Sequence, residues 1–210
     1  TQTMKNEIIT RSKTKSKIHL VDNPTASIAG VTQDKIKGFI FSGNAGRLQR
    51  IPLLLKSINK YKDEGGVLPF LFIGAGVYSD EIRTLSNKYK EIEYKGLVDT
   101  NTANDLTSRY EWALLPIEDE VTKYAFPSKT SSYASCGSNI LSICSEQTSV
   151  AKWVVNNNYG INTPPKIKDI VDVFFKIENG LTINKKNVDK NYYSIDNFVY
   201  KMFNIVFSNR

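Results

Sequence analysis

The sequence is poor in metal-binding side chains, with one histidine (His19) and two cysteines (Cys136 and Cys144) among 210 residues. These side chains form no His/Cys cluster in the sequence, so we expect no protein-ligated zinc or other metal site. Both cysteines have small or apolar neighbours. This context is typical of buried free thiols in a reducing compartment, rather than of a disulfide.

The sequence also lacks a run of about 18 apolar residues, which a membrane-spanning helix requires. Its first residues contain no apolar signal-peptide core. These absences predict a cytoplasmic protein. Because the chain opens on Thr1 and not on a methionine, we expect it to be part of a longer protein.

Basic residues exceed acidic ones, 28 to 21, for a formal net charge of +7. This balance favours an anionic partner, which could be a phosphate, a nucleic acid or an acidic membrane surface. Part of the excess is local to Arg11, Lys13, Lys15 and Lys17, a pattern typical of a solvated segment. Basic residues are not interleaved with aromatic ones, so we expect no nucleic-acid partner.

Short apolar runs alternate with helical spacing of apolar residues from residue 36 to residue 157. Strands are predicted at 36–41, 67–73, 92–94, 112–115 and 140–143, and helices at 47–61, 80–89, 102–109, 128–137 and 149–157, followed by helices at 166–178 and 195–207. The alternation predicts an α/β fold, a Rossmann-like parallel sheet with helices on both faces. Residues 1–24, with a helix, a basic stretch and a short strand at 18–21, are predicted to be a leading segment or linker before one domain at 25–210.

The first predicted strand is followed by a small-residue turn, 42–50 (SGNAGRLQR). Ligands of parallel sheets bind at the carboxyl ends of the strands. The small residues let the backbone approach a ligand closely, and the start of the following helix favours a phosphate. The residues expected to face that phosphate are Gly43, Asn44, Gly46, Arg47 and Arg50.

A second phosphate-binding segment is predicted at 126–130 (FPSKT), where another helix starts. Free N–H groups at Ser128 and Lys129, together with the Lys129 ammonium, would hold one phosphate. Pro127 and Thr130 belong to the same segment. The alternative interpretation is an ordinary serine cap. We therefore expect one phosphate-bearing ligand between the two segments.

Two further patterns admit other interpretations. Gly74 and Gly76 follow a strand and could belong to a dinucleotide-binding turn, but a lone Gly-x-Gly is a weak signal, and a close-approach turn at the rim of another site is favoured over NAD binding. Residues 117–120 (IEDE) could supply a general base or a metal site, but a solvated acidic loop is favoured.

Taken in order, these turns resemble the C-terminal half of a GT-B-type, family 4 glycosyltransferase. The similar stretches are 18–24 (IHLVDNP), 41–46 (FSGNAG), 71–76 (LFIGAG), 92–98 (IEYKGLV), 112–116 (WALLP) and 126–137 (FPSKTSSYASCG). The resemblance implies that the domain at 25–210 is one half of a GT-B fold and binds a nucleoside-diphosphate sugar. It also implies that no metal or cofactor is needed, because basic groups stabilise the leaving diphosphate.

The resemblance further implies a role for individual positions. Arg47 and Arg50 would neutralise the diphosphate, and Ser128 and Lys129 would bind its distal phosphate. The base would be lined by Gly96, Leu97 and Val98, with Leu106 nearby. The two spaced glutamates of the family align with Tyr124 and Ser132, and Ser132 keeps a hydroxyl that could bind the ribose.

In this family, the acceptor and much of the catalytic machinery belong to an N-terminal domain that this sequence does not contain, and no catalytic residue is assigned here. That domain would be in the same polypeptide or a separate subunit. The leading hypothesis is the donor-binding domain of a hexosyltransferase in surface polysaccharide synthesis, with a glycan or lipid-linked acceptor. The leading segment and last helix could then contact the missing domain or the inner face of the membrane.

Two alternatives remain open. The first is a non-catalytic nucleotide-sugar-binding subunit or degenerate domain, motivated by Tyr124 and Ser132. The second is another nucleotide-binding enzyme, such as an NAD-dependent dehydrogenase or an epimerase. The sequence does not indicate the base, the sugar, the acceptor or the linkage.

Overall fold

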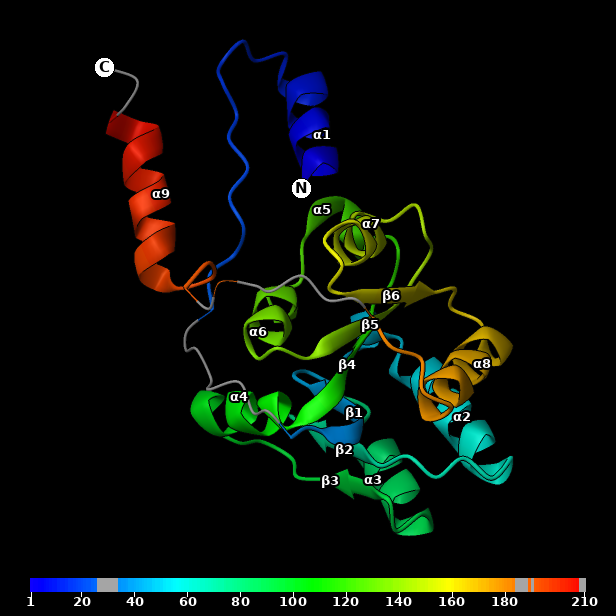
Figure 1. Ribbon diagram of the computed structural model, residues 1–210. Coiled ribbons are helices and arrows are strands. Elements are labelled where there is room, and N and C mark those ends of the chain that lie inside the picture. Colours follow the sequence, from blue (N-terminus) through cyan, green and yellow to red (C-terminus); the bar gives the residue numbers. More distant parts are fainter. Residues whose placement is uncertain (26–33, 184–188, 190, 208–210) are drawn as a thin grey trace.

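The computed structural model describes residues 1–25, 34–183, 189 and 191–207. Within them, a six-stranded parallel sheet has the order β3-β2-β1-β4-β5-β6 (Figure 1). The strands are β1 (Ile36–Ser42), β2 (Phe70–Ile73), β3 (Ile92–Tyr94), β4 (Tyr110–Pro116), β5 (Asn139–Ile143) and β6 (Gly160–Thr163). In sequence numbering this order reverses direction between β1 and β4, which is the arrangement of a doubly wound nucleotide-binding sheet.

Helices cover both faces of the sheet (Figure 1). One face carries α2 (Ile51–Asp63), α3 (Ser79–Lys88) and α8 (Ile167–Glu178), and the other carries α4 (Thr100–Ser108), α6 (Lys129–Ser135) and α7 (Ser149–Asn156). Side chains alternate between the two cores along β1: Phe39 and Phe41 pack on the first face and Ile40 on the second. Central strands buried on both faces have to be apolar throughout, which explains their continuous apolar runs. The predicted fold class is confirmed.

Three predicted boundaries need correction. The helix predicted at 47–61 is a 3₁₀ turn, η1 (Arg47–Gln49), followed by α2, because Arg50 between them is left-handed with a φ of 45°. Strand β2 begins at Phe70, directly after Pro69, and not at residue 67. Asp80 is not a cap, since α3 begins one residue earlier at Ser79.

Other differences concern short or polar segments. Helix α4 begins at Thr100, capped by Asp99, whose carboxylate accepts hydrogen bonds from the backbone N–H groups of Asn101 and Thr102. Residues 18–21 form no strand. Helix α5 (Val121–Tyr124) and the edge strand β6 were not predicted. An edge strand is covered on fewer sides than a central one, so β6 needs no continuous apolar run and leaves a weak signal.

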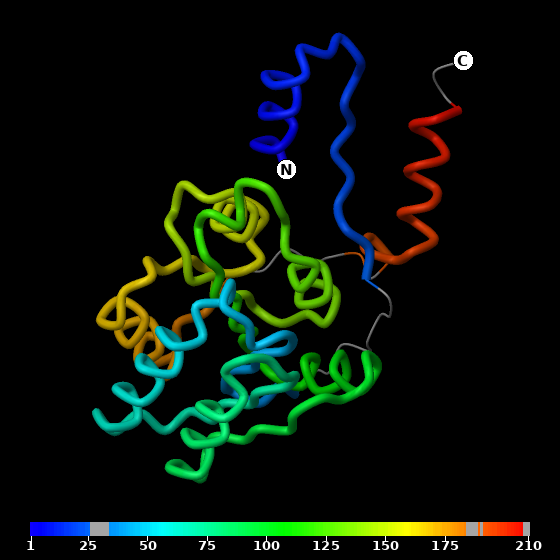
Figure 2. Tube along the Cα trace, turned by 180° about the vertical axis from the view of Figure 1, so that it is seen from behind, coloured from blue at the N-terminus to red at the C-terminus, as the bar shows by residue number. Residues whose placement is uncertain are grey.

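Helices α1 (Gln2–Ser12) and α9 (Ile195–Phe207) project beyond the sheet together with the chain that follows α1 (Figures 1 and 2). Neither helix has a buried residue, and Val199 and Phe203 of α9 are each 57% exposed. Among the residues described, none of the helices is long and apolar enough to span a bilayer. The sheet and its six flanking helices therefore carry the core.

Candidate functional site

A cleft of about 560 Å³ lies where β1, β2 and β3 end. This is the carboxyl edge of the sheet next to the reversal of strand order, where doubly wound sheets bind their ligands. Its lining includes these residues from the sequence prediction: Gly43, Asn44, Gly74, Leu97, Val98, Ser128, Lys129 and Ser132. The structure thus brings together residues from both predicted phosphate segments.

The floor of the cleft is made by two loops in direct backbone contact. The N–H of Gly43 donates to the carbonyl of Ile73 at 2.8 Å, and the N–H of Ala45 donates to the carbonyl of Ala75 at 3.0 Å. Gly74 has a φ of +113°, and a Cβ on it would lie 2.1 Å from the Gly43 carbonyl oxygen. The Gly-x-Gly turn is therefore a close-approach turn, as the sequence predicted, and the structure shows that it approaches the loop after β1.

Lys129 is the charged side chain of the cleft. Its Nζ is buried, lies 4.1 Å from the centroid of the Phe41 ring, and has no hydrogen-bond partner among the described residues. Gly43 leaves the space that this side chain occupies, since a Cβ there would lie 2.4 Å from Lys129 Cε. Burial lowers the pKa of Lys129 to about 7. An unpaired ammonium in such a place is unfavourable, and an anion in the cleft would relieve it.

Helix α6 is fixed to the end of β1 by the fully buried Tyr133. Its hydroxyl accepts from the N–H of Ser42 at 3.0 Å and donates to the Ser42 carbonyl at 3.1 Å. Burial raises the pKa of Tyr133, which keeps the phenol neutral and able to donate. This bond pair holds Lys129, four residues earlier, in position over the β1 turn.

The opposite end of the cleft is less polar. Leu97 and Val98 follow β3, and Ala103 of α4 lines the same wall. Leu97 is 80% exposed, so it presents an uncovered apolar surface. Between this wall and Lys129, the Ser132 hydroxyl donates to Asn104 Oδ1 at 2.7 Å.

Arg50, which was predicted to face a phosphate, does not line the cleft. Its Nε donates to the Ile117 carbonyl at 2.8 Å, and its Nη2 lies 3.0 Å from Glu118 Oε2 and 3.1 Å from Asp119 Oδ1. The left-handed backbone before α2 turns the side chain toward the loop after β4. The acidic loop predicted as solvated is therefore held by an ion pair.

Asp119 is tied into the same cluster. Its carboxylate accepts from the backbone N–H of Ser145 at 3.0 Å and from the Ser145 hydroxyl. Burial works to raise the pKa of Asp119, but the bonds from Ser145 and the charge of Arg50 outweigh it and hold that pKa below its ordinary value. The cluster joins the loops that follow β4 and β5, and none of its residues lines the cleft.

The other predicted residues that do not line the cleft are Gly46, Arg47, Gly96, Leu106, Pro127 and Thr130. Arg47 is exposed on η1. Leu106 packs toward the core, while Thr100, Ala103 and Asn104 of the same helix line the cleft, as helical periodicity requires. Thr130 is buried and its hydroxyl donates to the Pro127 carbonyl at 2.6 Å, whereas Ser128 makes no side-chain cap bond.

Sequence reasoning missed Asn104 and Tyr133 as site residues. The sequence signal that could have indicated Asn104 is its spacing of one helical turn from Thr100, on a helix that opens just after Leu97 and Val98, the residues predicted to line the base. Tyr133 lies within the segment that resembles family 4. No sequence signal shows that its hydroxyl reaches the backbone of Ser42.

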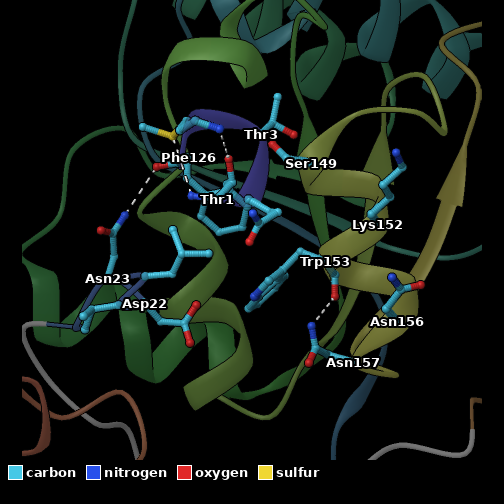
Figure 3. Close-up of a pocket in the computed structure, with 14 residues that line it drawn as sticks. Thr1, Thr3, Asp22, Asn23, Phe126, Ser149, Lys152, Trp153, Asn156 and Asn157 are labelled. Carbon is cyan, nitrogen blue, oxygen red and sulfur yellow. Dashed lines mark hydrogen bonds between the residues drawn. The ribbon is translucent and has the colours of Figure 1, made fainter. Parts of the chain in front are cut away.

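A second hollow, of about 640 Å³, lies between α1, residues 20–23 and α7 (Figure 3). The Trp153 ring points into it, and Lys152 and Asn156 stand at its exposed side (Figure 3). Asn23, which also lines it, donates from its side chain to the Phe126 carbonyl at 3.4 Å. Its lysine is solvated, so the smaller cleft, with its buried cation, is the stronger candidate for an anionic ligand.

Within the described ranges, no three His, Cys, Asp or Glu side chains come together as a metal site.

Comparison with known proteins identifies the fold. No protein-family model matches the sequence. The probable glycosyltransferase WbjE of Pseudomonas aeruginosa is 27% identical over 129 residues, covering 60% of this chain and 32% of that protein. The chain therefore matches about a third of the length of its curated relative.

Two solved glycosyltransferases superpose on almost the whole chain. The apo lipopolysaccharide outer core galactosyltransferase WaaB is 17% identical with a TM-score of 0.66, over 98% of this chain and 60% of its own. The pneumococcal O-GlcNAc transferase GtfA, in complex with UDP and GlcNAc, is 19% identical with a TM-score of 0.60, over 96% of this chain and 43% of its own. The chain has the fold of a GT-B glycosyltransferase domain.

Proposed function

We propose that the chain is the donor-binding domain of a glycosyltransferase and holds a nucleoside-diphosphate sugar in the cleft. The observation that carries this proposal is the Lys129 ammonium, which is buried in the cleft without a hydrogen-bond partner among the residues described. A diphosphate supplies the missing negative charge. UDP in the pneumococcal GtfA structure supports the ligand class.

The bound donor would lie along the cleft with its phosphates near Lys129 and the Gly43–Asn44 backbone, and its base against Leu97 and Val98. During transfer, the bond between the anomeric carbon and the phosphate oxygen breaks, and the oxygen of an acceptor hydroxyl bonds to that carbon. The proton of that hydroxyl passes to the leaving diphosphate or to water. Negative charge then accumulates on the leaving diphosphate. The Lys129 ammonium would stabilise that charge, most strongly where water is excluded.

The acceptor and the remaining catalytic groups would come from a further domain, because the chain spans only part of the relatives it matches. We assign 25–210 to donor binding and 1–24 to the connection with that domain. A glycan or lipid-linked acceptor in surface polysaccharide synthesis fits the lipopolysaccharide role in the name of WaaB. The hexosyl specificity, and a place at the cytoplasmic face of the membrane, are parts of the same proposal.

Calorimetric titration of the chain with UDP, GDP, dTDP and NAD tests this function. We expect at least one nucleoside diphosphate to bind, and NAD not to bind. NAD binding without binding of any diphosphate would overturn the proposal. It would favour a dehydrogenase or epimerase instead.

A non-catalytic binding domain is the second candidate, and one observation favours it. Ser132 lies in the cleft and Tyr124 is 60% exposed outside it, where the resemblance to family 4 would place two glutamates. Diphosphate binding without turnover by the full-length protein, assayed with the matching sugar donors, would support this candidate. Turnover would exclude it.

A further inference from the structure

The cleft contains no carboxylate. Of the residues described, Lys129 is the one charged side chain in its lining, and the remaining lining residues are polar or apolar. The stretches outside the described residues contain no aspartate or glutamate in the sequence. No acidic side chain of this chain therefore stands ready for the sugar hydroxyls of a nucleoside.

This composition matters because doubly wound sheets commonly hold a ribose through an acidic side chain, which accepts from its hydroxyls. A carboxylate offers two oxygens and a negative charge, so it binds a vicinal diol well and penalises the loss of one hydroxyl. In this cleft a neutral polar group is available instead.

That group is the pair formed by Ser132 and Asn104. Ser132 lies one helical turn beyond Lys129 on α6, about 4.5 Å farther along the axis. It contacts Asn104 of α4, and Ala103 of that helix lines the cleft together with Leu97 and Val98. A nucleotide with its phosphates at Lys129 and its base at that wall places its ribose beside Ser132. The Ser132 hydrogen is donated to Asn104, so its hydroxyl oxygen is left as a neutral acceptor.

We propose that the cleft discriminates only weakly between ribose and 2′-deoxyribose, so that its donors include 2′-deoxyribonucleoside diphosphate sugars. This inference depends on the proposed donor-binding function. One neutral hydrogen bond changes an affinity by less than about tenfold. A site that binds a hydroxyl through charged or fully buried partners discriminates far more strongly against the ligand that lacks this hydroxyl.

The test is calorimetric titration of the chain with UDP and 2′-deoxy-UDP, and with GDP and 2′-deoxy-GDP, at one pH and ionic strength. For the base that binds, we expect the two dissociation constants to differ by less than tenfold. A preference for the ribonucleotide above tenfold overturns the inference and leaves the proposed function standing. If neither these four ligands nor dTDP binds, the proposed function itself is overturned.

Variants at Ser132 show whether this position sets the preference. In Ser132→Glu, we expect the ratio of the two affinities to move toward the ribonucleotide by about tenfold or more. Repulsion between the new carboxylate and the diphosphate cancels in this ratio, because both ligands carry the same diphosphate. In Ser132→Ala, which removes little volume, the ratio should fall close to one.

Asn87→Glu, at an exposed position of α3, adds the same charge outside the cleft and should leave the ratio unchanged. If Ser132→Glu does not fold by circular dichroism, Ser132→Ala decides the question. A ratio in Ser132→Ala that stays equal to that of the parent, when the parent prefers ribose, means that Ser132 does not contact the sugar and overturns the inference.

Discussion

Lys129 Nζ lies 4.1 Å from the centroid of the Phe41 ring and has no hydrogen-bond partner among the residues described. A cation over an aromatic face gains about 0.5–2 kcal/mol, which does not replace the hydration of an ammonium. The residue is held there by α6, and α6 is held by Tyr133 on the backbone of Ser42. The fold thus keeps a cation in an unfavourable place that an anionic ligand would make favourable.

Replacing Lys129 should lower the affinity for a nucleoside diphosphate and raise the stability of the unliganded chain. In Lys129→Met, we expect nucleoside-diphosphate affinity to fall by about tenfold or more, because the buried charge opposite the phosphates is lost. The unliganded chain should become more stable by about 1–2 kcal/mol, because an unpaired buried cation is removed. Calorimetry and urea unfolding measure the two effects.

The control is Lys123→Met on α5, where the lysine is exposed and bonded to Glu120. It should change stability by less than about 0.5 kcal/mol and leave affinity unchanged. If both variants behave alike, the role given to Lys129 is wrong.

Stability should depend on pH through the same group. Burial lowers the pKa of Lys129 to about 7 in the folded chain, while in the unfolded chain it stays near 10.5. Between these values the unfolded state binds one proton more than the folded state. The destabilising effect of Lys129 is therefore fully present below about pH 7 and shrinks as the pH rises, by at most about 1.4 kcal/mol per unit.

This pH effect is measured as the difference in unfolding free energy between the parent and Lys129→Met at pH 7, 8 and 9. The advantage of the methionine variant should decrease across the series. Groups shared by both chains cancel in the difference. A constant or growing advantage would mean that Lys129 stays protonated in the folded chain.

The two arginines before α2 should behave differently from each other. Arg50→Met removes a charge-assisted bond to the Ile117 carbonyl and the counterion of Asp119, so we expect a loss of about 2–3 kcal/mol in stability. Nucleotide affinity should stay within about threefold, since the guanidinium points away from the cleft. Thermal unfolding and titration of the folded fraction check both statements.

Arg47→Met is the matched variant, because Arg47 is exposed on η1. It should leave stability within about 0.5 kcal/mol of the parent. A large loss of nucleotide affinity in Arg50→Met alone would show that the arginine reorients toward the ligand, against the geometry described.

The close contact between the loops that follow β1 and β2 depends on Gly74. Gly74→Ala would place a Cβ 2.1 Å from the Gly43 carbonyl oxygen at a φ of +113°, so the loops must separate. We expect a loss of about 2–4 kcal/mol in stability, together with weaker nucleotide binding. Urea unfolding measures the loss of stability, and calorimetric titration measures the nucleotide affinity.

Gly65→Ala separates steric conflict from backbone strain. Gly65 also has a positive φ, +92°, but a Cβ added there would meet no described atom within 4 Å. In Gly65→Ala, the unfolding free energy should fall by only about 1 kcal/mol, and nucleotide affinity should equal that of the parent. Equal losses at the two positions would show that backbone strain alone accounts for the effect at Gly74.

The sequence by itself determined the architecture. Runs such as 36–41 and 70–73 are largely apolar because central parallel strands are buried on both faces, and this property is local to each strand. Glycines at 43 and 74 likewise predicted turns whose backbone comes close to a ligand or to another part of the chain. Motif order was enough to indicate the glycosyltransferase fold.

The tertiary structure decided the partners of the charged residues. In the sequence, Arg47, Arg50 and Lys129 have equal claims to a phosphate, because a charge carries no local signal of what it faces. Folding pairs Arg50 with the loop after β4, leaves Arg47 in solvent and buries Lys129 unpaired in the cleft among the residues described. Those outcomes depend on segments that are far apart in the chain, such as Arg50 and Ile117, and only their meeting in space fixes them.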